Sequence, residues 1–248
     1  MRISFRTGTL AMLLIPALAT AGTAIWDYQG SHGPTHWSDL DAAYALCAKG
    51  SHQSPIDIDS GKVQPDRSDT LLTSYTPGPA TITNNGHTIM VAFHSAGGIH
   101  LDGEFYQLLQ FHFHTPSETR IDHKEYAMEM HIVHRSSKGR LAVVAVMLTP
   151  GNENKALKAV FQQLPKENGK PVALSTFDPT HLIPKPSGYL AYVGSLTTPP
   201  CTENVLWRVM ENPVEISNEQ YAAFKRRYPR NARPVQPLND RKILKAAY

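Results

Sequence analysis

The sequence has few charges, two cysteines and only one long apolar run. Charged residues make up 18% of the 248 positions, and 24 Lys and Arg against 21 Asp and Glu leave a net charge of +3. This balance gives no indication of binding to nucleic acid or to a charged membrane surface. The absence of repeats argues against a repeat architecture. The absence of any Asn-x-Ser/Thr sequon weakly favours a bacterial over a eukaryotic secretory route.

The first 24 residues have the pattern of a secretory signal. Arg2 and Arg6 form a charged start, an apolar run covers residues 10–19, and small residues offer cleavage after Ala21 or Ala24. The run is too short to span a bilayer as a mature helix. A buried N-terminal helix is the alternative, and a proline in its middle disfavours it. Removing the two arginines would lower the net charge from +3 to +1.

The two cysteines are Cys47 and Cys201. An even number of cysteines in a secreted protein favours a disulfide, and two free thiols are the alternative. A bond between them would close a very long loop, worth on the order of 4–5 kcal/mol in the chain-entropy model and commonly less in practice. Together with the signal, this pattern predicts a secreted protein, with the bacterial periplasm as its location.

Short runs of alternating apolar and polar residues recur along the rest of the chain, which is typical of β-strands. They lie at residues 81–83, 89–93, 104–106, 141–148, 189–193 and 205–209. No linker-like segment divides the chain, so residues 25–248 are predicted to form one sheet-dominated domain. Two helices are predicted, one over 153–164 that stops before Pro165 and one over 218–228 that follows the N-cap residue Ser217.

Histidine alternates with phenylalanine in the segment Gln110-Phe111-His112-Phe113-His114, which has the period of a half-buried strand. Side chains two positions apart point to the same face of a strand. His112 and His114 therefore share a face with Gln110, and the two phenylalanines lie on the other face.

A second histidine-bearing segment, residues 129–134, behaves in the same way. It places Glu129, His131 and Val133 on one face and His134 on the other, where a structural role is predicted. If the two strands are neighbours, His131 can converge with the two histidines of the first strand. Three neutral nitrogen ligands with an open fourth position are typical of a catalytic zinc site. The alternative is a set of hydrogen-bonded histidines without a metal.

Two polar residues could support such a site. Gln110 precedes His112 by two positions, and Glu129 precedes His131 by two positions. Each shares the face of its histidine, where an acceptor for the far ring nitrogen would fix the tautomer of the ligand.

Six sequence blocks then occur in a fixed order: residues 53–58 (QSPIDI), 84–87 (NNGH), 110–114, 129–134, 196–201 (LTTPPC) and 233–239 (RPVQPLN). With these blocks the chain resembles an alpha-class carbonic anhydrase of the secreted bacterial type, over about residues 26–243. The resemblance implies a mainly β (α+β) single domain around a large, mostly antiparallel twisted sheet of about ten strands, with short surface helices. It also implies a zinc enzyme, a carbonate dehydratase that reversibly hydrates carbon dioxide to bicarbonate and a proton.

The resemblance further implies roles for single residues. The zinc ligands would be His112, His114 and His131. The hydroxyl of Thr197 would donate to Glu118 and orient the zinc-bound hydroxide. His87 resembles the proton shuttle. The positions that resemble the carbon dioxide pocket are Val133, Val143, Leu196, Thr198 and Trp207, and those that resemble the water network are Tyr28 and Asn85.

The resemblance also implies covalent features and partners. Cys47 and Cys201 resemble the disulfide of the bacterial members, and Ser54–Pro55 and Pro199–Pro200 resemble two cis peptides of the family. Carbon dioxide and bicarbonate are the expected ligands, with sulfonamides and anions as inhibitors. We expect neither nucleic acid nor a membrane span, and a monomer or a homodimer.

Two positions depart from the pattern of the family. Thr119 stands where the family usually has a histidine, which casts doubt on the support of Glu118. Met90 stands where many relatives have a polar residue on the cavity wall, which could dry one side of the water path; a harmless change is the favoured interpretation.

Two other functions fit part of the sequence. His112-x-His114-x-x-x-Glu118 matches the first metal motif of a cupin, in which the glutamate is a ligand, but the second cupin block is absent from the sequence. A carbonic-anhydrase-like binding module without catalysis is the non-enzyme alternative. The presence of all three histidines with Thr197 and Glu118 disfavours it.

Overall fold

The computed structural model describes residues 24–66, 70–166, 169–184 and 188–247. Nearly all of the predicted signal, residues 1–23, lies outside the described residues. The strands are β1 (Asp57–Ile58), β2 (Gln64–Pro65), β3 (Leu71–Thr73), β4 (Gly78–Asn84), β5 (Ile89–Phe93), β6 (Gly98–Leu101), β7 (Glu104–His114), β8 (Arg120–Ile121), β9 (Met128–Ser136), β10 (Leu141–Pro150), β11 (Val172–Phe177), β12 (Gly188–Ser195), β13 (Glu203–Met210), β14 (Val214–Ile216) and β15 (Leu244–Ala247). The helices are α1 (Trp37–Leu40), α2 (Leu46–Lys49), α3 (Lys158–Gln162) and α4 (Asn218–Lys225), with 3₁₀ turns at Gly30–His32, Ala42–Tyr44, Ser60–Lys62 and Pro179–His181.

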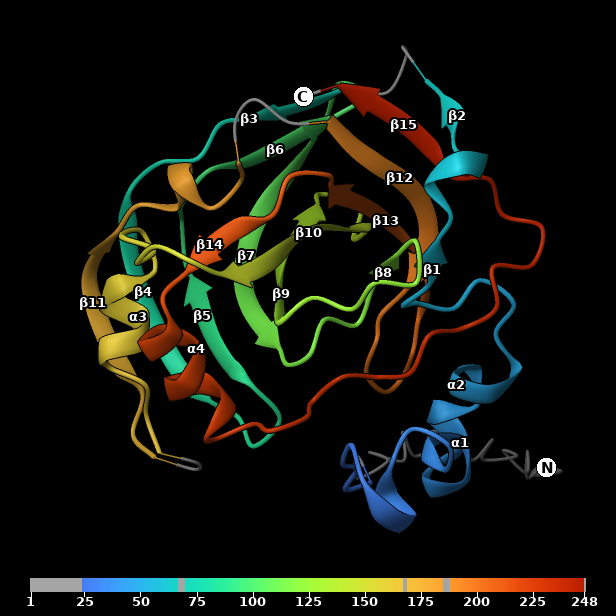
Figure 1. Cartoon of the computed structure of the whole chain (residues 1–248), viewed down its shortest axis with the longest axis horizontal. Helices are drawn as coiled ribbons and strands as arrows, with labels where there is room; N and C mark the ends of the chain where they lie inside the picture. The colour runs from blue at the N-terminus through green and yellow to red at the C-terminus, as the bar shows by residue number, and fades with distance from the viewer. Residues whose placement is uncertain (1–23, 67–69, 167–168, 185–187, 248) are drawn as a thin grey trace, which may run out of the picture.

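One large sheet organises the described residues (Figure 1). It contains thirteen of the described strands, and ten of them follow one another in the order β11-β4-β5-β7-β9-β10-β13-β12-β15-β2. Most neighbours are antiparallel, whereas β10 pairs in parallel with β13 and β14, and β15 with β2. The predicted large, mostly antiparallel sheet is confirmed. No helix in the described part of the chain is long and apolar enough to cross a membrane.

The two faces of β7 and β9 have different surroundings. Phe111 and Phe113 are fully buried and belong to the main core together with Met130 and Ile132. Burial of these large side chains, worth roughly 1.5–3 kcal/mol each, holds the apolar face of each strand toward the core. The histidines of β7 therefore point to the opposite face, as predicted.

The helices differ from the prediction. α4 begins where predicted, with a capping box formed by Ser217 and Gln220, but ends at Lys225. α3 covers only Lys158–Gln162 of the predicted 153–164, because Asn154 and the preceding Asn152 are held by hydrogen bonds to α4 and β14. α1 and α2 were not predicted, since four residues are too few to show a helical period. They lie near the N-terminal segment, away from α3 and α4 (Figure 1).

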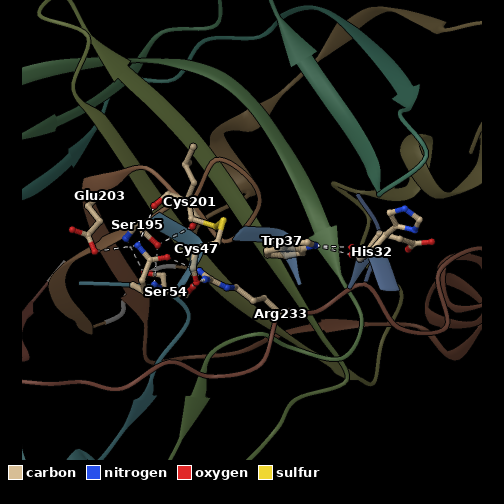
Figure 2. The surroundings of a disulfide bond; sticks show 11 residues. His32, Trp37, Cys47, Ser54, Ser195, Cys201, Glu203 and Arg233 are labelled. Atoms are coloured by element: carbon tan, nitrogen blue, oxygen red, sulfur yellow. Dashed lines mark hydrogen bonds between the residues drawn. A yellow bond between two sulfur atoms is a disulfide. The ribbon is translucent and has the colours of Figure 1, made fainter. Parts of the chain in front are cut away.

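The predicted disulfide between Cys47 and Cys201 is confirmed. It joins α2 to the loop before β13, inside a small cluster that includes Trp37 and Tyr44 (Figure 2). The two predicted cis peptides, Ser54–Pro55 and Pro199–Pro200, are also confirmed, and Thr115–Pro116 is a third.

His134 has the structural role that was predicted. It is fully buried on the core face of β9, and its Nε2 lies 2.7 Å from the hydroxyl of Tyr75. Burial lowers the pKa of His134 from 6.5 to about 3. The unfolded chain would thus take up a proton between these pH values that the folded chain excludes.

This difference predicts an acid-sensitive fold. Stability from neutral His134 is fully present above pH 6.5 and is lost by roughly 1.4 kcal/mol per pH unit as the pH falls below it. His134→Gln should flatten the dependence of the unfolding free energy on pH between 4 and 6.5, measured by urea unfolding. His94→Gln, at an exposed position, is the matched control. Identical slopes in His134→Gln and the unmodified protein would contradict this assignment.

Candidate metal centre

The predicted convergence of three histidines is confirmed. β7 and β9 are antiparallel neighbours, and His112 lies directly opposite His131 in their register. The ring of His114 lies 4.5 Å from that of His131 and 5.0 Å from that of His112, centroid to centroid. One nitrogen from each ring can be chosen so that all three lie within 4.8 Å of one another.

The other ring nitrogen of each histidine has its own acceptor. Gln110 Oε1 lies 2.9 Å from His112 Nδ1, and Glu129 Oε1 lies 2.9 Å from His131 Nε2, as predicted. The backbone carbonyl of Asn231 lies 2.8 Å from His114 Nδ1. These contacts fix the tautomers and leave His112 Nε2, His114 Nε2 and His131 Nδ1 for a metal ion.

The donor set fits zinc. His114 Nε2 is buried and has no hydrogen-bond partner among the described residues, a costly state that a metal bond would relieve. Burial lowers the pKa of His112 well below its usual value, helped by the two neighbouring histidines, and burial also lowers the pKa of His114. The rings of His112 and His114 are therefore neutral at physiological pH, which metal binding requires. The ligating group does not include Glu118, contrary to the cupin alternative.

Glu129 supports more of the site than the sequence indicated. Its Oε2 accepts hydrogen bonds from the backbone N–H groups of Glu118 and Thr119, at 2.8 and 2.7 Å. Its Oε1 accepts from the Thr119 hydroxyl at 2.9 Å and faces His131. Burial alone would raise the pKa of Glu129, but the pairing with His131 and these hydrogen bonds lower it.

The expected role of Thr119 was wrong. Its hydroxyl donates to Glu129, not to Glu118. The residue that holds Glu118 is Arg233, whose backbone N–H donates to Glu118 Oε1 at 2.8 Å. The departure at Thr119 therefore bears on the orientation of the ligand His131.

Glu118 is a buried carboxyl beside the histidines. Burial raises its pKa to about 7, against the lowering effects of His131, the Arg233 N–H and the hydroxyl of Thr197. A divalent cation held by the histidines would lower the pKa of Glu118 and so favour the ionised carboxylate. Thr197 is itself buried and lies four residues before the disulfide-bonded Cys201.

The predicted apolar pocket residues lie together beside the histidines. Val143 on β10 is opposite both Val133 on β9 and Trp207 on β13. All three are buried, and Leu196 packs against their cluster. The ring of Trp207 lies edge-on to that of His131, with 4.9 Å between the centroids.

The other side of the histidines opens into a cavity of about 140 Å³. Its walls include the ligands His112 and His114 and most of the predicted polar positions, among them Tyr28, Asn85, His87 and Thr198. Met90 also lines the cavity, opposite His112 on the neighbouring strand. The structure thus places the apolar residues beside His131, through Trp207, and the largely polar cavity beside His112 and His114.

His87 is half-buried at this cavity and stacks on Trp26, with 3.7 Å between ring centroids and 7° between planes. Its backbone N–H donates to Asn85 Oδ1, and its carbonyl accepts from Asn231 Nδ2.

Sequence reasoning missed the contributions of Trp26, Asn231 and Arg233. Trp26 and Asn231 have no local motif. Arg233 belongs to one of the six blocks, but nothing in the block indicates what the arginine contacts.

Comparisons with known proteins agree with this geometry. Residues 32–247 match the family model of the eukaryotic-type carbonic anhydrases. A carbonic anhydrase from Nostoc sp. is 41% identical over 96% of this chain and 92% of its own length, and one from Klebsiella pneumoniae is 40% identical over 96% and 97%. The structure of an alpha-carbonic anhydrase from Thermovibrio ammonificans in complex with the inhibitor sulfanilamide aligns with a TM-score of 0.87 at 42% identity, covering 90% of this chain and all of that one.

The contacts of Glu129 predict its importance for metal binding. Glu129→Gln would place an amide NH₂ among four donors, so the ring of His131 would lose its fixed orientation. Zinc affinity should fall by roughly 10- to 100-fold, measured by competition with a chromogenic chelator. Glu125→Gln, the same change at an exposed carboxylate, is the control and should leave the affinity unchanged. Equal affinities of both variants would refute this role.

Proposed function

This chain belongs to the eukaryotic-type carbonic anhydrase family, and from that premise we propose how its residues carry out the reaction of the family. The reaction is the zinc-dependent, reversible hydration of carbon dioxide to bicarbonate and a proton. The observation that carries the proposal is the set of three converging imidazoles beside an apolar cluster and a polar cavity. His112, His114 and His131 hold the zinc ion.

The chain supplies the orientation of the nucleophile. Zinc, when bound, lowers the pKa of water to about 7, a value known from carbonic anhydrases themselves, and so supplies hydroxide at neutral pH. Ionised Glu118 can only accept hydrogen bonds, so the hydroxyl proton of Thr197 is committed to it. The lone pairs of Thr197 then face the attacking oxygen and aim it at the carbon of the substrate.

The apolar wall binds the substrate. Carbon dioxide has no net charge and no hydrogen-bond donor, so burial against hydrocarbon costs it little. Val133, Val143, Leu196 and Trp207 form this wall next to His131. Thr198 lines the polar cavity. We assign this cavity as the route by which bicarbonate leaves.

Proton export uses the polar wall. An imidazole has a pKa near 6.5 in its usual state, which suits a group that accepts a proton and passes it to buffer. His87 lies at the cavity, half exposed to solvent, and Tyr28 and Asn85 line the same space. We assign the shuttle to His87 and the ordering of water to Tyr28 and Asn85.

Location and ligands follow from the family and the disulfide. Structural disulfides persist in oxidising compartments, so the Cys47–Cys201 bond supports secretion, with residues 1–24 as signal peptide and the bacterial periplasm as destination. Sulfonamides are proposed as inhibitors because the Thermovibrio ammonificans relative binds sulfanilamide. Inhibition by anions, and a monomer or homodimer, stay predictions of the resemblance.

Thr197→Val tests the orientation of the nucleophile. Valine keeps the branched shape and removes the hydroxyl, so zinc should stay bound at one ion per chain. The kcat/KM for carbon dioxide hydration should fall on the order of 100-fold, measured by stopped flow. Thr202→Val, an exposed position of the same loop, should keep full activity. A fully active Thr197→Val enzyme would rule out the assigned role.

His87→Ala tests the proton route. In weak buffer the turnover should fall on the order of 100-fold, because proton transfer then depends on solution acceptors. Added imidazole should restore it. The exposed His123→Ala should behave like the unmodified enzyme. Unchanged turnover of His87→Ala in weak buffer would show that protons leave by another path.

A further inference from the structure

Arg233 carries a charge that lies almost entirely inside the protein. Its exposed fraction is 2%, and among the described residues it has no carboxylate within ion-pair distance. Burial lowers its pKa to about 10, so the side chain remains charged at neutral pH. A buried cation without an acidic partner is costly unless its donors are satisfied. Here backbone and amide oxygens accept from both Nη atoms, whereas the buried Nε has no hydrogen-bond partner among the described residues.

The acceptors of the Arg233 guanidinium come from the disulfide region. Nη2 donates to the carbonyl of Cys47 at 2.8 Å, and Nη1 donates to Gln53 Oε1 at 2.9 Å and to the carbonyl of Ser54 at 2.7 Å. Gln53 in turn donates to the carbonyl of Cys201. Figure 2 shows the side chain extending toward Cys47 and Ser54. The guanidinium therefore contacts one half of the disulfide directly and the other through Gln53.

The same side chain contacts the N-terminal aromatic cluster. Its guanidinium carbon lies 5.6 Å from the centroid of a Trp37 ring. The indole N–H of Trp37 donates to the carbonyls of Asp27 and His32. Arg233 is thus held from several directions by segments that lie about 180 residues or more away in sequence.

The main chain of Arg233 faces the reaction centre. Its N–H donates to Glu118 Oε1. Glu118 is the carboxylate proposed above to accept the hydrogen bond from the Thr197 hydroxyl. We infer that the Arg233 side chain is a positioning residue for carbon dioxide hydration: by fastening its own backbone to the disulfide region, it fixes Glu118 and, through Glu118, the hydroxyl of Thr197. This inference rests on the function proposed for Thr197 and Glu118.

The link from the Arg233 side chain through its backbone N–H to Glu118 can affect the reaction rate. The Arg233 N–H holds one oxygen of the Glu118 carboxylate, and small displacements of a positioning group can cost large factors in rate. Loss of the guanidinium would free the backbone N–H to move with its segment. The Arg233 side chain does not contact the zinc ligands. Asn231, which holds His114, has its own hydrogen bonds to Thr115, His87 and Phe113, so the zinc ligands should stay in place.

A double-mutant cycle on zinc-loaded enzyme tests the inference. Arg233→Met should lower kcat/KM about tenfold in the unmodified background and less than twofold in the Thr197→Val background, because both changes act on one hydroxyl. Arg233→Lys should lose less than Arg233→Met. A merely structural role would give the same factor in both backgrounds, and that result would overturn the inference.

Two further variants keep the test decisive. Gln53→Met removes one acceptor of the guanidinium, so it serves if Arg233→Met does not fold, and about a threefold loss with the same non-additivity is expected. Arg208→Met is the matched control. Arg208 is also buried, at 5% exposure, but its guanidinium contacts the carbonyl of Trp207 and the ring of Tyr189, so its effect on kcat/KM should be small and additive. Full activity of Thr197→Val alone would instead refute the proposed function.

Discussion

The register between β7 and β9 is the constraint on which the rest of the structure depends. Because side chains alternate along a strand, a slip of one residue would turn His112 and His114 toward the core and bring Phe111 and Phe113 to the cavity. The buried phenylalanines prevent this slip, since their exposure would cost several kcal/mol. The packing of one face thereby determines the metal chemistry of the other.

Parts of the chain that are distant in sequence complete the site. The segment after α4 brings Asn231 to the far nitrogen of His114 and Arg233 to Glu118. The disulfide joins the loop of Thr197 to the N-terminal region. Arg233 contacts Cys47 directly and Cys201 through Gln53. Metal binding needs mainly the two strands and the acceptors of their histidines, Asn231 among them, whereas orientation of the nucleophile depends on the contacts of Arg233 and on the disulfide. The two functions should therefore be separable by mutation.

The features that follow from the alternation of side chains along a strand could be predicted from the sequence. The faces of β7 and β9, with the pairing of Gln110 and Glu129 to their histidines, were predictable because i and i+2 share a face. The acceptor of His114 was not predictable, because 117 residues separate it from Asn231. The departure at Thr119 was expected to affect Glu118, whereas its hydroxyl contacts Glu129, for a related reason: adjacency in sequence does not determine which of two buried acceptors a short side chain reaches. The shortest helices likewise lacked a period to detect.

The most direct test of zinc-dependent catalysis at the three histidines is a zinc titration of metal-free protein, with carbon dioxide hydration followed by stopped flow at each step. Activity should rise in proportion to bound zinc, saturate at one ion per chain and disappear on chelation. Because His131 is the zinc ligand from β9, whereas the other two come from β7, His131→Ala should lose tight zinc binding and activity together. Full zinc occupancy without hydration, or hydration that does not depend on zinc, would contradict the central claim.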